Sequence, residues 1–368
     1  MNNIYLQIPL RKPDISEVVL ATVTKTTGST PQKPGSSALF NQFELVTGTV
    51  GGGILEGKVQ QIARESVVTK ESGHYLFDLN SSHPEGEDAL CGGKINVLID
   101  SRLDKHIAAF EALQKSAELR IPGVLVTLVT VLEDEKATVS RYWCTGDSYS
   151  MLPAEYSSKI SPGIDRILSD TILGEFREIE LAGPQEKPSS IVFLEPVIPA
   201  PRLFIAGAGH IGKALAKIAA MLDFEITVID DRPEFANREN IPSADHIITD
   251  EIGKTIDTIE KGPDTYIVIV TRGHRDDAAV LQACIRSDAA YVGMIGSRNK
   301  VALMKKDFIK KGLATKEQWD RIYSPVGLEI NSQTVGEIAV SIAAQLVKVR
   351  NAKDKSQKLK DKSKTTKH

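Results

Sequence analysis

The sequence predicts an α/β fold in two parts, and three observations carry this prediction. The chain has 368 residues, which exceeds the usual size of one domain. From residue 202 onward, short apolar runs alternate with amphipathic helical stretches, as in a parallel sheet covered on both faces. A Gly-x-Gly-x-x-Gly turn at 207–212 lies between the first such strand and its helix. We therefore expect an N-terminal α/β (α+β) domain and a C-terminal Rossmann-like doubly wound parallel sheet.

The boundaries follow from composition. The segment SSIVFLEPVIPAPR, residues 189–202, contains three closely spaced prolines and is the best linker candidate. We place the domains at 1–199 and 200–350. The remaining residues, 351–368, are lysine-rich and lack apolar periodicity, which predicts a disordered tail.

In the first domain, β-branched and apolar runs bounded by Gly, Pro and Ser predict strands. Helices are predicted where apolar residues recur at helical spacing. The expected strands are 17–24, 43–50, 94–100, 122–132, 136–144 and 175–181, and the expected helices are 54–70, 104–120 and 161–173.

Composition and charge narrow the class of protein. The net charge of −3 provides no basic field for nucleic acid, and three cysteines without a CxxC pair favour a reducing cytoplasm. The N-terminus has no signal-peptide pattern. The longest apolar run, at 124–132, is far shorter than the roughly 18–20 residues of a membrane helix. We expect a cytoplasmic protein with no nucleic-acid or membrane partner.

The turn at 207–212 has the features of a dinucleotide-binding site. Gly207 permits the tight turn, Gly209 lets backbone approach a pyrophosphate, and Gly212 lets helix and strand pack closely. Asp230 ends the next strand, where a carboxylate can accept hydrogen bonds from a ribose diol. His210 either faces the ligand phosphate or caps the turn. The alternative is a Rossmann scaffold whose crevice is empty or repurposed.

Other polar residues are expected at the carboxyl ends of the strands, where ligands bind in such sheets. They are Arg272, His274 and Ser297. Asp276 and Asp277 are more simply interpreted as the cap and first turn of the next helix.

A run of three glycines, Gly51, Gly52 and Gly53, separates a predicted strand from a helix. Such a run can adopt positive φ and aim several N–H groups at an anion. The competing interpretation is a tight turn with no ligand. Glu56 falls in the first helical turn, where it either contacts a ligand or only stabilises the helix dipole.

A second glycine motif contains a thiol. Cys91 precedes Gly92 and Gly93, and the nearby Lys94 can lower the thiol pKa. The alternative is a buried, inert cysteine. Cys144 and Cys284 lie in apolar surroundings and are expected in the cores. The sequence has no HExxH, GxSxG or Walker motif, so a zinc enzyme or hydrolase is not supported.

Taken together, these segments resemble the XdhC/CoxI family of accessory proteins for xanthine dehydrogenase and related molybdenum hydroxylases. The resemblance covers both halves in order, in TGSTPQKPGSSAL (27–39), GTVGGGILEG (48–57), LCGGKINVLID (90–100), LFIAGAGHIGKALAKIA (203–219), TVIDDRPEFAN (227–237), VTRGHRDD (270–277), YVGMIGSRNK (291–300) and YSPVGLEINSQTVGEIAVSIAAQLV (323–347).

The resemblance implies a chaperone for molybdenum cofactor, in its molybdopterin or dinucleotide form. Such a protein holds the cofactor while a cysteine desulfurase supplies its sulfido ligand, and then assists insertion into the hydroxylase. It implies functional roles for the triple glycine, Glu56 and Cys91, with a molybdenum contact through the Cys91 thiol, and it favours a homodimer. Relatives often have a cysteine after the triple glycine, where this chain has Ile54. If that cysteine handles sulfur in the relatives, this protein either relies on Cys91 alone or performs less of the sulfur chemistry.

Two other functions stay open. An NAD(P)-dependent oxidoreductase would use the 207–212 turn, although no Tyr-xxx-Lys pair accompanies it. An assembly factor would contact the hydroxylase and the desulfurase without holding the cofactor.

Overall fold

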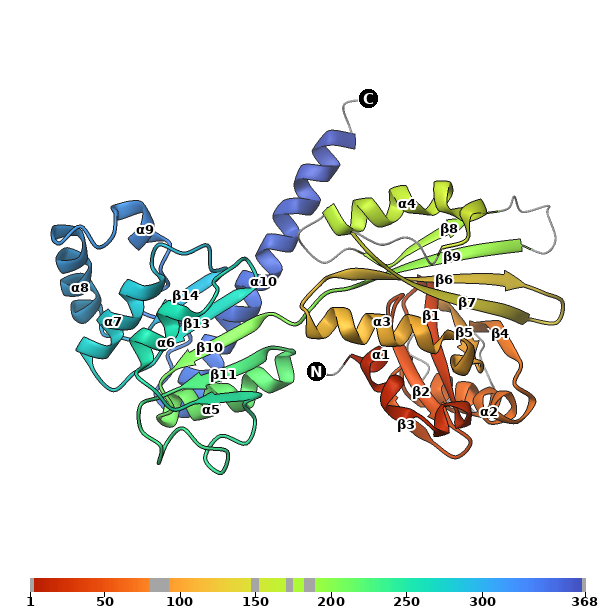
Figure 1. Cartoon of the computed structure of the whole chain (residues 1–368), viewed down its shortest axis with the longest axis horizontal. Coiled ribbons are helices and arrows are strands. Elements are labelled where there is room, and N and C mark those ends of the chain that lie inside the picture. Colours follow the sequence, from red (N-terminus) through yellow and green to blue (C-terminus); the bar gives the residue numbers. More distant parts are fainter. Residues whose placement is uncertain (1–2, 80–92, 147–151, 170–174, 182–188, 366–368) are drawn as a thin grey trace. The chain divides into compact units, whose positions relative to one another are not determined.

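The computed structural model describes residues 3–79, 93–146, 152–169, 175–181 and 189–365. Its contacts divide the chain into two compact units, Asn2–Pro199 and Ala200–His368 (Figure 1).

The N-terminal unit is built on a nine-stranded sheet in which all neighbouring strands are antiparallel, in the order β3-β2-β1-β5-β4-β7-β6-β9-β8. The strands are β1 (Val18–Gly28), β2 (Ser37–Asn41), β3 (Leu45–Gly48), β4 (Ser72–Asp78), β5 (Gly93–Asp100), β6 (Gly123–Val131), β7 (Lys136–Thr145), β8 (Arg177–Glu180) and β9 (Ser189–Val197).

This sheet curls strongly, because strands far apart in its order are in contact. Lys25 on β1 forms an ion pair with Glu178 on β8, with an N–O distance of 3.2 Å. A β-carbon placed on Gly35, which precedes β2, would lie 3.3 Å from the ring of Phe176, which precedes β8. The curl thus brings the end of β9 near the start of β2.

Helices cover this sheet on separate faces. The helices are α1 (Ile4–Gln7), α2 (Gly53–Thr69), α3 (Ile107–Glu118) and α4 (Ala154–Ser169), with short 3₁₀ turns η1 (Pro9–Arg11), η2 (Asp14–Glu17) and η3 (Leu103–His106). Apolar residues of α1 and α3 share one core with Leu20 and Leu39. The neighbouring residues Val19 and Phe40 point to the other face and pack with α2, as the alternation of strand side chains requires.

The C-terminal unit contains a parallel five-stranded sheet with the order β12-β11-β10-β13-β14. The strands are β10 (Arg202–Ala206), β11 (Glu225–Ile229), β12 (His246–Ile248), β13 (Thr265–Ile269) and β14 (Tyr291–Met294). The order reverses between β10 and β13, which defines the switch point where ligands bind in such sheets. The prediction of a Rossmann-like sheet behind an N-terminal α/β domain is therefore confirmed.

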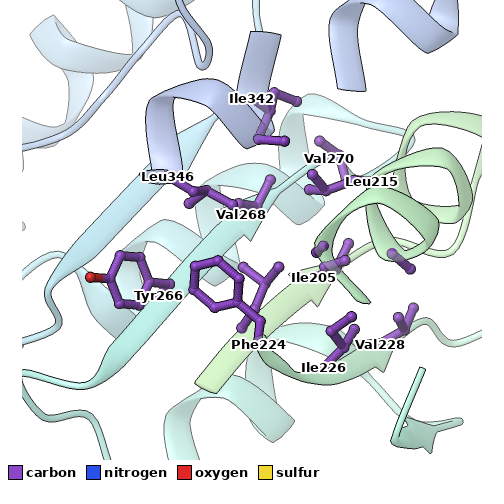
Figure 2. Close-up of a cluster of buried hydrophobic side chains, with 14 of the residues drawn as sticks. Ile205, Leu215, Phe224, Ile226, Val228, Tyr266, Val268, Val270, Ile342 and Leu346 are labelled. Carbon is purple, nitrogen blue, oxygen red and sulfur yellow. The ribbon is translucent and has the colours of Figure 1, made fainter. Parts of the chain in front are cut away.

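Helices cover both faces of this sheet. They are α5 (His210–Ala219), η4 (Ala220–Leu222), α6 (Ile252–Thr258), α7 (His274–Cys284), α8 (Arg298–Lys310), α9 (Lys316–Asp320) and α10 (Val335–Thr365). Figure 2 shows one core, in which Leu215 of α5 and Ile342 and Leu346 of α10 pack over strand residues such as Val268. On the other face, α6, α7 and α8 bury Ile256, Leu281 and Met304 against the sheet.

Four segments differ from the sequence-based expectations. The strands β2 and β4 had no predicted counterpart. Residues 189–197, within the predicted linker, form β9 between β6 and β8. The backbone of α10 continues to Thr365 and covers most of the predicted disordered tail. Ala, Lys, Gln and Leu are good helix formers, and no Gly or Pro interrupts them there, so the helix continues without an apolar stripe.

Across the described residues, no helix combines the length and the apolar character needed to cross a membrane.

Candidate functional site in each unit

The N-terminal glycine motifs meet at the loop that follows β1. A β-carbon on Gly93 would lie 2.5 Å from the Thr27 carbonyl oxygen and 2.7 Å from that of Ser29. A β-carbon on Gly51 would lie 2.7 Å from Pro31 Cγ. A hollow of about 530 Å³ is lined by this loop, including Gly28, Pro31 and Lys33. The loop thus joins the triple-glycine turn to the start of β5.

The triple glycine has the backbone conformation that the sequence predicted. The φ angles of Gly51, Gly52 and Gly53 are 138°, 74° and 53°. All three lie in the region that residues with a β-carbon rarely adopt, which explains why glycine is used three times. The expectation of at least one positive φ is confirmed.

Glu56 takes a role that the sequence did not resolve. Its carboxylate turns back onto the glycine turn, accepting hydrogen bonds from the Thr49 hydroxyl at 2.6 Å and from the Val50 N–H at 3.2 Å. The N–H of Gly51 donates to the Thr49 hydroxyl oxygen at 3.1 Å. Glu56 therefore fills part of the expected anion nest itself, instead of bordering an open concavity.

The ionisation of Glu56 agrees with this arrangement. Partial burial acts to raise its pKa, but hydrogen bonds from Thr49 and from the backbone of Gly52, Val50 and Gly51 outweigh burial and hold the pKa below its ordinary value. The turn therefore binds a carboxylate anion at neutral pH, which demonstrates the chemistry that it offers.

Donors remain beside the filled nest. Within the described residues, the N–H groups of Gly53, Ile54 and Leu55 have no backbone or side-chain acceptor, as is normal for the first turn of a helix. A β-carbon on Gly52 or Gly53 would meet no heavy atom within 4 Å beyond its chain neighbours. An anion therefore has free approach to the start of α2.

The thiol motif is described only in part. Cys91 and Gly92 lie outside the described residues. Gly93 is buried at the start of β5, opposite Gly28 on β1. Its missing side chain lets the 27–30 loop pack closely, which gives Gly93 a packing role, and its contact with a ligand stays a prediction.

In the C-terminal unit, the three glycines of the Gly-x-Gly-x-x-Gly turn have separate roles. Gly207 has a φ of 120°, and a β-carbon there would lie 2.5 Å from the Val270 carbonyl oxygen. A β-carbon on Gly212 would lie 1.9 Å from the Gly207 carbonyl oxygen. One on Gly209 would meet nothing within 4 Å. Gly209 is thus the position at which a ligand can approach the backbone.

Asp230 is engaged by protein groups. Its carboxylate accepts hydrogen bonds from the Ala208 N–H at 2.8 Å and from Arg232 Nε and Nη2 at 2.8 and 2.9 Å. Burial acts to raise its pKa, but these bonds lower it overall. The Arg232 guanidinium also lies 4.0 Å from the centre of the Phe235 ring. Asp230 therefore fixes the glycine turn and holds Arg232, rather than presenting a free carboxylate to a ribose.

The remaining predicted residues lie at the carboxyl edge of the sheet. His210 and His274 are the exposed first residues of α5 and α7. Arg272 Nη2 lies 3.1 Å from the Asp231 carboxylate, so an exposed ion pair joins the segments after β11 and β13. The Ser297 hydroxyl caps α8 by accepting from the Lys300 N–H at 3.3 Å.

A buried ion pair at this edge was missed by the sequence analysis. Asp277 is fully buried, and its carboxylate accepts hydrogen bonds from Lys300 Nζ at 2.5 Å and from the Thr271 hydroxyl at 2.6 Å. The interpretation of Asp277 as a simple first-turn residue is therefore incomplete. The signal available was Lys300 itself, which ends the segment YVGMIGSRNK and lies in the first turn of α8, where it reaches Asp277.

No cluster of three or more His, Cys, Asp or Glu suited to a metal ion occurs among the residues that the structure describes.

The comparisons with known proteins agree with both units. The model of the XdhC and CoxI family matches residues 16–78, and that of the XdhC Rossmann domain matches residues 203–346. A Bacillus subtilis protein described as a probable subunit of xanthine dehydrogenase is 26% identical over 354 residues, or 95% of this chain and 98% of that protein. The uncharacterized protein YqeB of Escherichia coli is 34% identical over 152 residues, which are 41% of this chain and 28% of YqeB.

The fold has a solved counterpart. A crystal structure described as that of a xanthine dehydrogenase from Bacillus halodurans superposes with a TM-score of 0.73 at 24% identity, covering 94% of this chain and 95% of that one. Since separate family models match segments of both units, in the order found in the chain, this protein belongs to the XdhC and CoxI family, which is associated with xanthine dehydrogenase.

Proposed function

We propose that this protein binds molybdenum cofactor, in its molybdopterin or dinucleotide form, supports its sulfuration, and delivers it to a molybdenum hydroxylase of the xanthine dehydrogenase type. The observation that carries the proposal is the glycine turn of the N-terminal unit. Its three positive φ angles, its bound carboxylate and the free N–H groups after Gly52 form a site for an anion. The phosphate of molybdopterin is such an anion.

The C-terminal unit supports a second anion contact. Arg232 and Arg272 lie in the segments after β11 and β13, next to the open position at Gly209. Because Asp230 is already paired with Arg232, the edge favours a phosphate over the ribose diol of NAD. We therefore assign this crevice to a phosphate-bearing portion of the cofactor or to another nucleotide.

Sulfur handling is assigned to Cys91 by elimination among the three cysteines. Cys144 and Cys284 are buried, and burial raises the pKa of each thiol to about 12. Both are therefore protonated and inaccessible at neutral pH. A Cys91 thiolate would attack the outer sulfur of a desulfurase persulfide and release the desulfurase thiolate, so that one sulfane sulfur moves without net oxidation.

The protein itself would contribute binding and protection. The backbone N–H groups at the start of α2 would hold the phosphate, and the loop after β1 would border the bound group. The cofactor, when bound, supplies the molybdenum centre that the client enzyme uses. A cysteine desulfurase, the hydroxylase and a second copy of this chain are the proposed partners.

The test is recovery of the full-length protein from cells that make molybdopterin, with the released pterin measured by fluorescence. We expect the wild type to carry molybdopterin and Gly53→Ala to lose most of it, because alanine disfavours a φ of 53° by about 1 kcal/mol. Gly57→Ala is the matched control, since Gly57 lies in the same helix without positive φ and with open space around it. Wild-type protein free of molybdopterin would contradict the proposal.

Cys91→Ser tests the sulfur step separately. We expect it to reduce activation of an apo-hydroxylase at least tenfold in an assay with desulfurase, while the circular dichroism spectrum stays unchanged. Activation equal to that of the wild type would exclude Cys91 as the sulfur carrier.

A further inference from the structure

A second cavity, of about 430 Å³, lies within the N-terminal unit, and its polar residues Tyr5 and Glu195 lie outside the motifs quoted above. Its wall combines the start of α1, the ends of β3 and β9, and the start of β2. The polar side chains that line it include Tyr5, Ser37 and Glu195, and Gly35 and Gly48 lie beside them. The volume suits a small bicyclic molecule.

The polar groups of this cavity form a connected chain. The Tyr5 hydroxyl donates a hydrogen bond to Glu195 Oε2 at 2.6 Å, and it lies 3.0 Å from the Ser37 hydroxyl. Ser37 in turn donates to the Thr22 hydroxyl at 3.0 Å. Among the described residues, the hydrogen bond found for the Glu195 carboxylate goes to Oε2, and none is found for Oε1. A carboxylate oxygen at the cavity wall is therefore left for a ligand that donates hydrogen bonds.

The electrostatic surroundings restrict that ligand. Burial raises the pKa of Glu195 to about 7, while the Tyr5 hydrogen bond and the Arg141 charge act against this rise. Arg141 is itself buried and already paired with Asp100, with Nε 2.9 Å from the carboxylate. Arg141 is therefore not a partner for the second oxygen of Glu195, and that oxygen favours a ligand that offers N–H donors.

We infer that this cavity binds the 2-amino-4-oxopyrimidine edge of a pterin, with Glu195 accepting from the ring N–H and the exocyclic amine. These two donors are parallel and adjacent, which matches the two oxygens of one carboxylate. Each carboxylate oxygen has two lone pairs, so Oε2 can keep its bond to Tyr5. The inference rests on the proposed function, because molybdopterin contains this ring system.

One wall of the cavity is close in sequence to the glycine turn. Gly48 lines the cavity, and Gly51 is three residues later, so their Cα atoms are at most about 11 Å apart. The same edge also occurs in guanine, which the dinucleotide form of the cofactor can carry. Pterin and guanine share a ring N–H beside an exocyclic amine, and the experiment distinguishes these two ring systems.

The experiment measures binding of small probes to the full-length protein by isothermal titration calorimetry. Pterin is compared with lumazine, in which a carbonyl oxygen replaces the exocyclic amine and would face the carboxylate. Guanosine is compared with inosine, which has only a hydrogen in place of the exocyclic amine. We expect pterin to bind at least tenfold more tightly than lumazine and more tightly than guanosine.

Glu195→Gln keeps the shape but removes the carboxylate, and we expect it to abolish the preference for pterin. Glu178→Gln is the matched control, because Glu178 lies on the neighbouring strand and pairs with Lys25 instead of lining the cavity. Equal binding of pterin and lumazine, unchanged discrimination in Glu195→Gln, or tighter binding of free arginine than of pterin would overturn the inference. Tighter binding of guanosine than of both pterin and inosine would assign the cavity to guanine instead.

Molybdopterin recovery distinguishes the two proposals. If the wild type and Glu195→Gln carry equal molybdopterin from cells, the inference fails while the proposed function holds. If the wild type carries none but discriminates pterin from lumazine, the proposed function fails and the pterin-edge site remains.

Discussion

The two glycine-rich turns of this protein share a plan but use their glycines differently. Each lies between a strand and a helix, and in each a carboxylate accepts a backbone N–H of the turn: Glu56 from Val50, and Asp230 from Ala208. At 51–53 all three glycines have positive φ, whereas at 207–212 only Gly207 does. The first turn uses glycine for conformation, while the second uses it mainly for close approach.

The carboxylates also differ in charge balance. Asp230 is neutralised by Arg232, whereas no ion pair of Glu56 is found among the described residues. A motif of glycines before a helix therefore does not by itself define how much negative charge a bound anion would meet. That balance depends on side chains outside the motif.

The largest expected loss of stability comes from a glycine that the second turn needs for close approach of the backbone. Gly212→Ala places a β-carbon 1.9 Å from a carbonyl oxygen, so we expect it to destabilise the C-terminal unit by at least about 3 kcal/mol. Gly209→Ala should cost about 1 kcal/mol or less, because its surroundings are open.

Each unit contains one tryptophan, Trp143 or Trp319, which provides the measurement. Urea unfolding followed by Trp319 fluorescence in a Trp143→Phe background reports the C-terminal unit alone. Similar losses for the two glycine variants would show that this turn also uses its glycines for conformation.

A smaller effect is expected from the charge balance of the second turn. Asp230→Asn leaves Arg232 without its counter-charge and weakens the bond to Ala208, so we expect a loss of about 2 kcal/mol. The same Trp319 fluorescence assay measures it. A double variant that also carries Arg232→Gln should recover part of the lost stability. If the effects of the two substitutions simply add, Asp230 and Arg232 do not neutralise each other.

The smallest effect concerns the first turn. The pKa of Glu56 is lowered in the folded state, so its contribution is present above the ordinary value of 4.5 and is lost as pH falls through the folded pKa. Glu56→Gln should therefore speed amide exchange at 50–52 at pH 7, with a loss of about 1 kcal/mol.

Hydrogen-exchange mass spectrometry, corrected for the intrinsic pH dependence of exchange, measures this difference. The wild type should lose its extra protection towards pH 3 and approach the variant there. Equal protection in the two proteins at pH 7 would mean that Glu56 does not hold the turn.

The sequence was sufficient for the parts of the fold in which local signals agree. The turn at 207–212 between an apolar strand and a helix predicted the parallel sheet, and the run of glycines predicted positive φ. The prolines around Pro196 predict a linker, yet the same residues form β9, which pairs along its whole length with β6. Proline is tolerated there at the end of the strand.

The candidate sites were harder to predict because their polar groups come from distant segments. Asp277 has the sequence position of an ordinary helix-start carboxylate, and only the folded sheet buries it beside Lys300. Glu195 lies in the supposed linker, and only the curl of the sheet brings it to Tyr5. Neither contact has a sequence signal at short range.

The contact between Tyr5 and Glu195 also bears on how the protein is made. These residues are 190 positions apart, and Tyr5 lies in a core together with Leu125 and Val197. During synthesis, α1 can pack against β1, β2 and α3 early, but its core is complete only when β9 has emerged. A chain shortened before β9 would leave one edge of β6 unpaired and Tyr5 without Glu195, so such fragments should be prone to aggregation.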